Sequence, residues 1–484
     1  MGVPCRTARM RLTPRGGCNN KDERQSVEIG RGILTTKKLF IRTFGCQMNV
    51  HDSEQLEELL KAQGYARTES AKEADLIIVN TCSIRDKAEQ KVYSQLGRYR
   101  HLKKTKPGLQ IGVCGCVAQQ QGGRLLEKTP FLDLVVGTHN LDRLPEFIGR
   151  ARRTGRPVVE TGFRETVPSI GIPTLPARGS VSAFVTIMQG CDNYCAFCVV
   201  PYLRGREESR KFGDILAEVK ALAARGVKEV TLLGQNVNSY GKSPGDGHTF
   251  AELLRAVGGI EGIERIRFTT SHPKDLSDDI IACFRDVKAL CESIHLPVQS
   301  GSDEVLARMN RRYTSAEYLD RVRRLREASP EIAVSSDIIV GFPGEAEQDY
   351  QKTLDLMEKV RFDTLFSFQY SERQGTAAVG LDGKVSPGEK RRRLIELQAL
   401  QDRHTREKND SLVGRIVEVL VDGTSRNTAR DVTGRTRSNK IVNFAGGKDL
   451  IGKTVQVRIV EAFLHSLRGE MLDVQGGVSR CSSK

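Results

Sequence analysis

The sequence predicts a multidomain α/β protein with three folded parts: an N-terminal α/β domain built on a parallel sheet, a partial (β/α)6 barrel and a small C-terminal β-barrel. Three observations predict this architecture. Strand and helix patterns alternate between residues 38 and 116, six strand patterns recur with helix patterns from Ser182 onward, and short strands with polar–apolar alternation follow residue 408. With 484 residues and 38% hydrophobic content, the chain is too long for one ordinary domain and apolar enough for packed cores.

The same patterns place the domain boundaries. We expect a basic tail over residues 1–36, an N-terminal domain over 37–153, a central domain over 177–407, the small barrel over 410–474 and a tail over 475–484. The first tail is rich in Arg, Gly and Pro without a periodic apolar stripe, so we expect disorder. An organelle transit peptide is the alternative, but Pro4, Pro14 and Gly16-Gly17 interrupt its helix. Cys5 and Cys18 fall in this tail and are not expected to be ligands.

In the N-terminal domain, a cysteine follows each predicted strand. The strands are predicted over residues 38–43, 76–80 and 111–113, with helices over 53–63, ended by Gly64, and 86–103. Cys46, Cys82 and Cys116 come after these strands in turn, and Cys114 is an additional thiol. The carboxyl ends of parallel strands meet at one edge, where such sheets bind ligands. We therefore expect three cysteines to converge there, the alternative being buried thiols that only happen to end strands.

The central domain has six strand patterns, most of them followed by a helix. The strands are predicted over residues 183–188, 229–233, 265–269, 293–296, 334–340 and 364–369, and the helices include 214–224, 276–284, 315–328 and 346–360. Six repeats indicate a barrel short of the full eight. The chemistry of such barrels lies at the carboxyl ends of the strands.

Three cysteines spaced C-x3-C-x2-C follow the first barrel strand: Cys191, Cys195 and Cys198. Three thiolates can bind three irons of a four-iron cluster and leave the fourth iron open to a reactant, whereas a saturated metal is usually structural. Half of a zinc ribbon is the alternative. A ribbon needs a second ligand pair roughly 15–20 residues on, and the next His and Cys are His248 and Cys283.

Polar, glycine-containing loops follow other strands of the barrel, over residues 234–238, 299–302 and 341–345. A cofactor with a carboxylate, a ribose and an adenine needs donors, acceptors and close backbone approach at such positions. Ordinary capping of the loops is the alternative. In the loop over 201–210, the arginine side chains suit a carboxylate or a phosphate, or else pair with the neighbouring glutamates.

Beyond a charged helix around residues 389–408, strands are predicted over 416–421, 440–444 and 454–460. About 65 residues of short strands indicate a small five-stranded barrel, and such barrels commonly bind oligonucleotides. The stretch over 431–440 is basic, and we expect it to be flexible and to contact RNA. The alternative is a barrel that packs on the central domain, with solvated arginines.

Composition limits the partners. The net charge of +15 suits a polyanion, although charge alone is weak evidence. The 12 cysteines, grouped in cluster spacings, indicate a reducing compartment, and no apolar run approaches the roughly 18 residues of a membrane span.

Together these motifs resemble a known family. The C-x3-C-x2-C segment resembles the radical S-adenosylmethionine (SAM) superfamily, and with Phe-Gly-Cys-Gln-Met-Asn, Asn-Thr-Cys and Gly-Cys-Val-Ala-Gln upstream the chain is similar to the methylthiotransferases from about Lys37 to about Val474. The resemblance implies two [4Fe-4S] clusters: an auxiliary cluster on Cys46, Cys82 and Cys116, and a radical SAM cluster on Cys191, Cys195 and Cys198 that also binds SAM. It selects Cys116 over Cys114, places Gln235 and Asn236 near the amino group of SAM, and implies a TRAM module that binds RNA.

Within this family, the segments 191–201, 232–240 and 270–275 resemble members that convert N6-isopentenyladenosine beside the tRNA anticodon to its 2-methylthio derivative, using two SAM per turnover. Sister enzymes acting on threonylcarbamoyladenosine in tRNA or on a ribosomal-protein aspartate are alternatives, as is an iron–sulfur protein that only binds RNA. The implied partners are tRNA carrying a prenylated adenosine and an electron donor such as flavodoxin or ferredoxin. We expect a cytoplasmic monomer without a membrane anchor.

Overall fold

The computed structural model describes residues 36–82, 86–164, 179–242, 247–425, 428 and 430–472. The two predicted tails, with Cys5 and Cys18, lie outside the described residues apart from Thr36. Within the described part of the chain, no helix is both long and apolar enough to cross a membrane.

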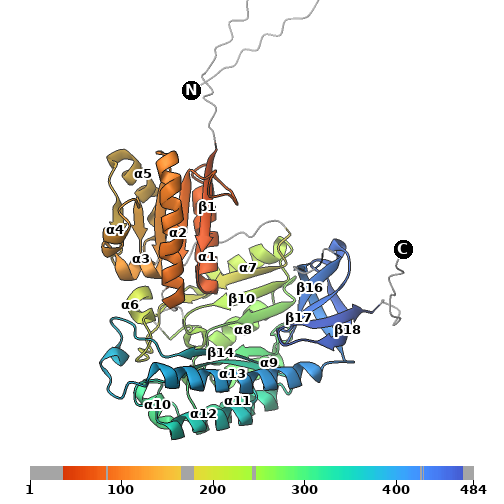
Figure 1. The fold of residues 1–484 in the computed structure, drawn as a ribbon. Coiled ribbons are helices and arrows are strands. Elements are labelled where there is room, and N and C mark those ends of the chain that lie inside the picture. Colours follow the sequence, from red (N-terminus) through yellow and green to blue (C-terminus); the bar gives the residue numbers. More distant parts are fainter. Residues whose placement is uncertain are drawn as a thin grey trace, which may run out of the picture. The chain divides into compact units, whose positions relative to one another are not determined.

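A parallel sheet of six strands, in the order β2-β1-β3-β4-β5-β6, forms the centre of the N-terminal domain (Figure 1). The strands are β1 (Lys37–Thr43), β2 (Tyr65–Arg67), β3 (Leu76–Thr81), β4 (Gln110–Gly115), β5 (Leu134–Val136) and β6 (Val158–Glu160). The helices are α1 (Gln47–Lys61), α2 (Asp86–Thr105), α3 (Cys116–Gln121), α4 (Arg124–Lys128), η1 (Leu141–Arg143) and α5 (Leu144–Thr154). The predicted parallel α/β domain is confirmed.

Helices cover both faces of this sheet. Along β3, Leu76 and Ile78 pack with α1 and α5, whereas Ile77 and Val79 pack with α2 and α4. Because successive side chains of a strand point to opposite faces, a strand covered on both sides is apolar throughout. All six residues of β3 and of β4 are buried.

Two boundaries differ from the prediction. The first helix begins at Gln47, not at residue 53. The prediction missed its first turns because their polar side chains, including Asn49, His51 and Asp52, are buried rather than exposed. This removes the polar face on which the periodicity rule depends. The sheet also continues past residue 153, since β6 adds a sixth strand.

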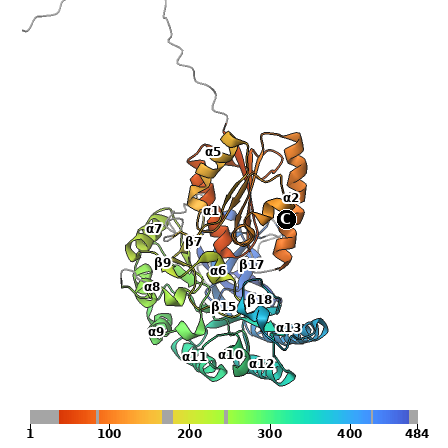
Figure 2. The same ribbon diagram turned by 90° about the vertical axis from the view of Figure 1, so that its left-hand side faces the viewer.

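Two three-stranded parallel sheets, β11-β10-β7 and β12-β13-β14, form the partial barrel, joined by one parallel bridge between Ile266 and Leu290 (Figure 2). The strands are β7 (Ser182–Thr186), β10 (Glu229–Leu233), β11 (Arg265–Phe268), β12 (Ser293–His295), β13 (Ala333–Val340) and β14 (Thr364–Gln369). The helices are α6 (Val200–Arg204), α7 (Phe212–Ala224), η3 (Val237–Ser239), α8 (Phe250–Gly258), η4 (Pro273–Asp275), α9 (Asp278–Asp286), α10 (Asp303–Arg308), α11 (Ser315–Ala328), α12 (Glu347–Val360) and η5 (Ala377–Gly380). Five of the six predicted strands are confirmed, and the first is confirmed over most of its length.

The first predicted barrel strand is interrupted. It ends at Thr186, and β8 (Met188–Gln189) then pairs antiparallel with β9 (Glu208–Ser209). This short ribbon encloses the segment that carries Cys191, Cys195 and Cys198. It therefore fixes both ends of the cysteine loop at the mouth of the barrel.

The C-terminal module is a closed five-stranded barrel in the order β15-β16-β17-β19-β18, as predicted. Helix α13 (Pro387–Asp410) leads into β15 (Ile416–Thr424), β16 (Asp431–Thr436), β17 (Ile441–Ala445), η6 (Lys448–Leu450), β18 (Thr454–Ala462) and β19 (Leu467–Met471). Its core is a small apolar cluster around Val419, Phe444 and Ile459.

Candidate metal centres

The three N-terminal cysteines converge at one edge of the parallel sheet. Cys46 precedes α1, Cys82 directly follows β3, and Cys116 is the first residue of α3. The Cys46 and Cys82 thiols lie within hydrogen-bonding distance of one another. Gly45 allows this approach, because its φ is +136° and a Cβ there would lie 2.4 Å from the Cβ of Cys82.

Buried amides hold these cysteine loops together. Asn49 donates to the carbonyl of Thr81 at 3.2 Å, and Asn80 donates to the carbonyl of Asn49 at 2.9 Å and to Ser53 Oγ at 3.0 Å. The Cys46 thiol donates to Asn49 Oδ1 at 3.4 Å. Sequence reasoning did not assign Asn49 and Asn80 a role, although a polar residue inside the buried strand β3 was a usable signal.

The structure separates Cys114 from Cys116. Cys114 lies within β4 and packs in the apolar cluster with Leu134 and Phe147, and burial raises the pKa of its thiol to about 12. Cys116 instead contacts Val199 and Leu203, at the α6 end of the second cysteine loop. Cys116, and not Cys114, therefore belongs with Cys46 and Cys82.

Backbone contacts shape the second cysteine loop. The Cys198 N–H donates to the Cys195 carbonyl at 2.9 Å, and the Cys191 N–H to the Gly205 carbonyl at 3.3 Å. Tyr194 has a φ of +48°, which is strained for a residue with a side chain, and Asn310 Nδ2 holds its carbonyl at 2.9 Å. Such strain at a site is typical of a loop shaped for binding.

A guanidinium lies beside each cysteine set. Arg311, almost fully buried, donates from Nη1 to Cys195 Sγ at 3.4 Å, and the charge of Arg204 acts on the Cys116 thiol. Burial raises the pKa of Cys191 to about 11 and of Cys198 to about 12. The hydrogen bond with Cys82 and the charge of Arg204 lower the pKa of Cys46 to about 6.

Both sets fit a cluster bound through thiolates. None of the nine cysteines among the described residues forms a disulfide. Within the same residues, no three His, Cys, Asp or Glu side chains are grouped as the ligands of a single metal ion. A four-iron cluster takes its three thiolates on three different irons, and the converging sulfurs and paired guanidinium groups supply the charge that it requires.

Of the two residues predicted to contact SAM, Gln235 also holds the cysteine loop. Gln235 Oε1 accepts from the N–H of Gly190 at 2.6 Å, directly before Cys191. Asn236 donates to Asp275 at 2.8 Å and accepts from the His272 N–H at 3.1 Å, so both ends of its buried amide are engaged. Of the two side chains, Gln235 is the one better placed for a ligand at Cys191.

The three arginines of the loop after the cysteines have different environments. Arg204 is buried in an ion pair with Asp52 at 2.6 Å, and Arg210 in one with Glu218 at 2.6 Å. Arg206 is 82% exposed and lies 3.2 Å from Asp192. All three arginines are thus paired internally, two of them in buried pairs, and the Arg204–Asp52 pair joins this loop to α1 of the N-terminal domain.

The prediction that the basic stretch over residues 431–440 is flexible is wrong. Residues 431–436 form β16, and the turn after it packs against the central domain. Arg437 pairs with Glu292 at 2.7 Å, and Lys440 donates to Asn409 at 2.8 Å. Arg265 and Arg267, in β11, donate to the carbonyls of Arg435, Thr436 and Arg437. These arginine and lysine side chains are therefore bound by carboxylate, amide and carbonyl oxygens of the protein rather than left in solvent.

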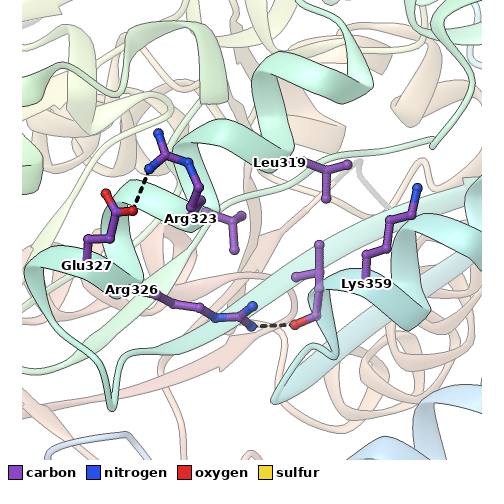
Figure 3. A pocket seen from close by; sticks show the side chains of 7 residues that line it. Leu319, Arg323, Arg326, Glu327 and Lys359 are labelled. Carbon is purple, nitrogen blue, oxygen red and sulfur yellow. Dashed lines mark hydrogen bonds and ion pairs between the residues drawn. The ribbon is translucent and has the colours of Figure 1, made fainter.

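A surface pocket of about 380 Å³ lies elsewhere, between α11 and α12, where Arg323 pairs with Glu327 (Figure 3). Its lining residues are Leu319, Val322, Arg323, Arg326, Glu327, Lys359 and Val360. None of the cysteines lines it, so we assign it no part in the metal centres.

Comparison with known proteins follows this division of the chain. Residues 38–137 match the family described as Uncharacterized protein family UPF0004, residues 185–357 the Radical SAM superfamily, and residues 410–472 the TRAM domain.

Curated relatives match along almost the whole chain. The tRNA-2-methylthio-N(6)-dimethylallyladenosine synthase of Syntrophus aciditrophicus is 59% identical over 439 residues, covering 91% of this chain and 95% of the relative. The protein of the same name from Geobacter sulfurreducens is 54% identical over 445 residues, covering 92% and 99%. The radical S-adenosylmethionine methyltransferase TsrM from Kitasatospora setae has a TM-score of 0.55 at 14% identity, covering 71% of this chain and 77% of that one, which shows the fold alone. The chain belongs to the tRNA-2-methylthio-N(6)-dimethylallyladenosine synthase family, within the radical SAM superfamily.

Proposed function

We propose that the chain is a radical SAM methylthiotransferase that replaces C2–H of N6-isopentenyladenosine, next to the tRNA anticodon, with a methylthio group, using two SAM per turnover. One observation carries the proposal: two cysteine triads lie at the carboxyl ends of two parallel sheets, on either side of the short helix α6. A purely structural cluster is usually saturated by four protein ligands, whereas each set here supplies three. Two sets suit a reaction that must both remove a hydrogen and deliver sulfur.

Each triad has a separate role. Cys46, Cys82 and Cys116 would hold the auxiliary [4Fe-4S] cluster, and Cys191, Cys195 and Cys198 the radical SAM cluster. Reductive cleavage of SAM at the second cluster supplies the radical needed for an aromatic C–H that has no acid–base handle. Arg311 balances thiolate charge at Cys195. Gln235 and Asn236 are assigned to SAM, and the Asn236 amide is oriented by Asp275 and His272.

Exposed apolar side chains around the triads suit a prenylated base. Val50 in α1, Tyr194 between two cysteines and Tyr202 in α6 are 38%, 42% and 48% exposed. Burying a five-carbon arm against such surface contributes a few kcal/mol, at ~0.8 kcal/mol per buried carbon. Threonylcarbamoyladenosine would bring a carboxylate that requires a cation.

The substrate is tested with nucleoside mass spectrometry. Purified enzyme with SAM, sulfide and reductant should modify prenylated tRNA and leave unprenylated tRNA unchanged, and tRNA from cells lacking the gene should lose the 2-methylthio nucleoside until the gene is restored. Comparable turnover on threonylcarbamoylated tRNA, or turnover only on a ribosomal protein, would assign the chain to a sister enzyme.

An electron donor, a location and an oligomeric state complete the proposal. We assign an electron donor such as flavodoxin or ferredoxin, a cytoplasmic location and a monomeric state. The net charge of +15 suits both an acidic electron carrier and tRNA. Sedimentation of the purified chain and reconstitution with each carrier test these assignments.

A further inference from the structure

Helix α6 directly connects the surroundings of the two cysteine triads. It begins at Val200, two residues after Cys198, and Leu203 on it packs against Cys116. Figure 1 shows α6 between the N-terminal sheet domain and α10. The helix therefore contacts one triad with its side chains and continues the backbone of the other.

The far end of α6 is attached to both sites. Thr138 Oγ1 donates to the Leu203 carbonyl at 2.5 Å, and His139 Nε2 lies 3.0 Å from the Arg204 carbonyl. Gly205 follows with a φ of +77°, and a Cβ there would lie 3.0 Å from the His139 ring. Its carbonyl accepts from the Cys191 N–H. The segment is thus held from the N-terminal domain while it holds the second cysteine loop.

The guanidinium of Arg204 is the main side-chain link. It is 4% exposed and donates to Asp52 Oδ2 at 2.6 Å, where Asp52 is 7% exposed on α1, the helix that starts after Cys46. The positive charge of the same guanidinium also acts on the Cys116 thiol. Burying an ion pair costs desolvation energy and is weak evidence for stability. Because the buried Arg204–Asp52 pair costs desolvation energy, we expect it to have a role other than stability.

We propose that Arg204, anchored by Asp52, is a positioning residue that fixes α6 between the triads, sets how the auxiliary site faces the radical SAM site, and supplies positive charge beside the auxiliary thiolates. This inference rests on the proposed assignment of two clusters. A misplacement of about 1 Å in a reacting group can cost about a hundredfold in rate. Loosening α6 therefore uncouples hydrogen removal from methylthio transfer without removing either set of ligands.

The test uses Arg204→Gln, Arg204→Lys and Asp52→Asn in the full-length protein carrying both clusters. All three variants should keep SAM cleavage, while the ratio of 5′-deoxyadenosine to methylthiolated nucleoside rises about tenfold to a hundredfold. A redox titration followed by electron paramagnetic resonance, without tRNA, gives the second readout. Arg204→Gln should lower the midpoint potential of the auxiliary cluster, because a positive charge that favours its reduced state is lost.

The other variants separate charge from geometry. Arg204→Lys keeps the charge but lacks the planar fork that reaches Asp52 and Cys116 together, so its potential should stay near wild type while coupling falls. Asp52→Asn removes a negative charge and should shift the potential upward, opposite to Arg204→Gln. These opposed shifts would not arise from a general loss of stability.

Arg210→Lys is the matched control. Arg210 is also buried, with 7% exposure, and pairs with Glu218 at the same 2.6 Å just beyond α6. It should alter neither the auxiliary potential nor the product ratio. If all three test variants keep the wild-type auxiliary potential and product ratio, the role given to Arg204 is wrong, while the proposed function still stands. A wild-type protein with only one cluster, or without methylthio transfer, would instead overturn the proposed function.

Discussion

At the scale of single residues, the cysteine loops depend on backbone shapes that most side chains forbid. Gly190 precedes Cys191 with a φ of +78°, and a Cβ there would lie 1.9 Å from the Arg206 carbonyl oxygen. Its N–H is held by Gln235. The loop can therefore close on its cluster only with glycine at this position.

Gly190→Ala should disrupt the second triad and spare the first. The clash with a backbone oxygen and the positive φ together should cost about 2–4 kcal/mol. Reconstituted iron should fall from about 8 to about 4 Fe per chain, with SAM cleavage lost. Gly213→Ala is the control, because nothing lies within 4 Å of a Cβ there. Full iron content in Gly190→Ala would show that the loop adapts.

Glu207 gives the site a pH dependence. Burial raises the pKa of this carboxyl to about 7; the hydrogen bond from Ser239 opposes the shift, and the charges of Asp192 and Asp275 add to it. The folded state thus holds a proton that the unfolded state loses near its ordinary pKa of about 4.3. The free energy of unfolding should therefore fall as the pH rises from about 4.3 to about 7, and it should stay low above pH 7.

Glu207→Gln should remove this dependence. The substitution keeps an acceptor for Ser239, so the melting temperature should exceed that of wild type by about 2–4 °C at pH 8.5, with a smaller difference at pH 6. Thermal melts at the two values measure the change. A difference that stays constant with pH would mean that Glu207 does not titrate here.

At the scale of elements, the turn between β16 and β17 docks the small barrel on the central domain. Arg437 bonds both carboxylate oxygens of Glu292 and the Leu290 carbonyl, while Arg265 and Arg267 reach across in the other direction. Cations committed to these partners are poorly placed to neutralise phosphate. RNA contact through this module is then expected from its outward residues.

Arg437→Ala should weaken docking without changing the electrostatics of tRNA binding. Loss of these charge-assisted bonds should cost about 1–3 kcal/mol in unfolding free energy. The slope of log affinity against log salt should change by much less than the 0.7–0.9 or so per phosphate contact. Arg458→Ala, on the exposed face of β18, is the comparison for loss of one positive charge. If the salt slope of Arg437→Ala falls by the amount expected for one phosphate contact, Arg437 contacts RNA after all.

At the scale of the whole molecule, the two metal centres belong to two different parallel sheets. Each triad is held by its own backbone contacts and its own guanidinium, Arg204 or Arg311. The two sites should therefore load independently, although α6 links their geometry.

Replacing Cys191, Cys195 and Cys198 with Ala should leave about 4 of about 8 Fe and abolish SAM cleavage. Replacing Cys46, Cys82 and Cys116 should also leave about 4 Fe, but should spare cleavage of SAM to 5′-deoxyadenosine while stopping methylthiolation. Iron analysis and chromatography of the nucleosides measure both effects. Full iron retention in either triple variant would contradict the assignment of its ligands.

The sequence by itself determined the α/β alternation, the six barrel strands, the small five-stranded barrel and the convergence of Cys46, Cys82 and Cys116. These follow from local periodicity and from the rule that parallel strands end at one edge. The sequence located only three of the six N-terminal strands and predicted a flexible stretch where β16 lies. Family resemblance, and not periodicity, selected Cys116 over Cys114 and identified the upstream set as the ligands of an auxiliary cluster.

Only the tertiary structure decided which polar and charged groups meet. The pairs Arg204–Asp52 and Arg437–Glu292 join residues more than 140 positions apart, and no local pattern encodes such a contact. The start of α1 at Gln47 was hidden for the same reason, because its polar first turns are buried by the neighbouring cysteine loops. Local sequence shows that a residue is charged, but burial and its partner, which the fold alone supplies, decide whether that charge meets solvent, RNA or another domain.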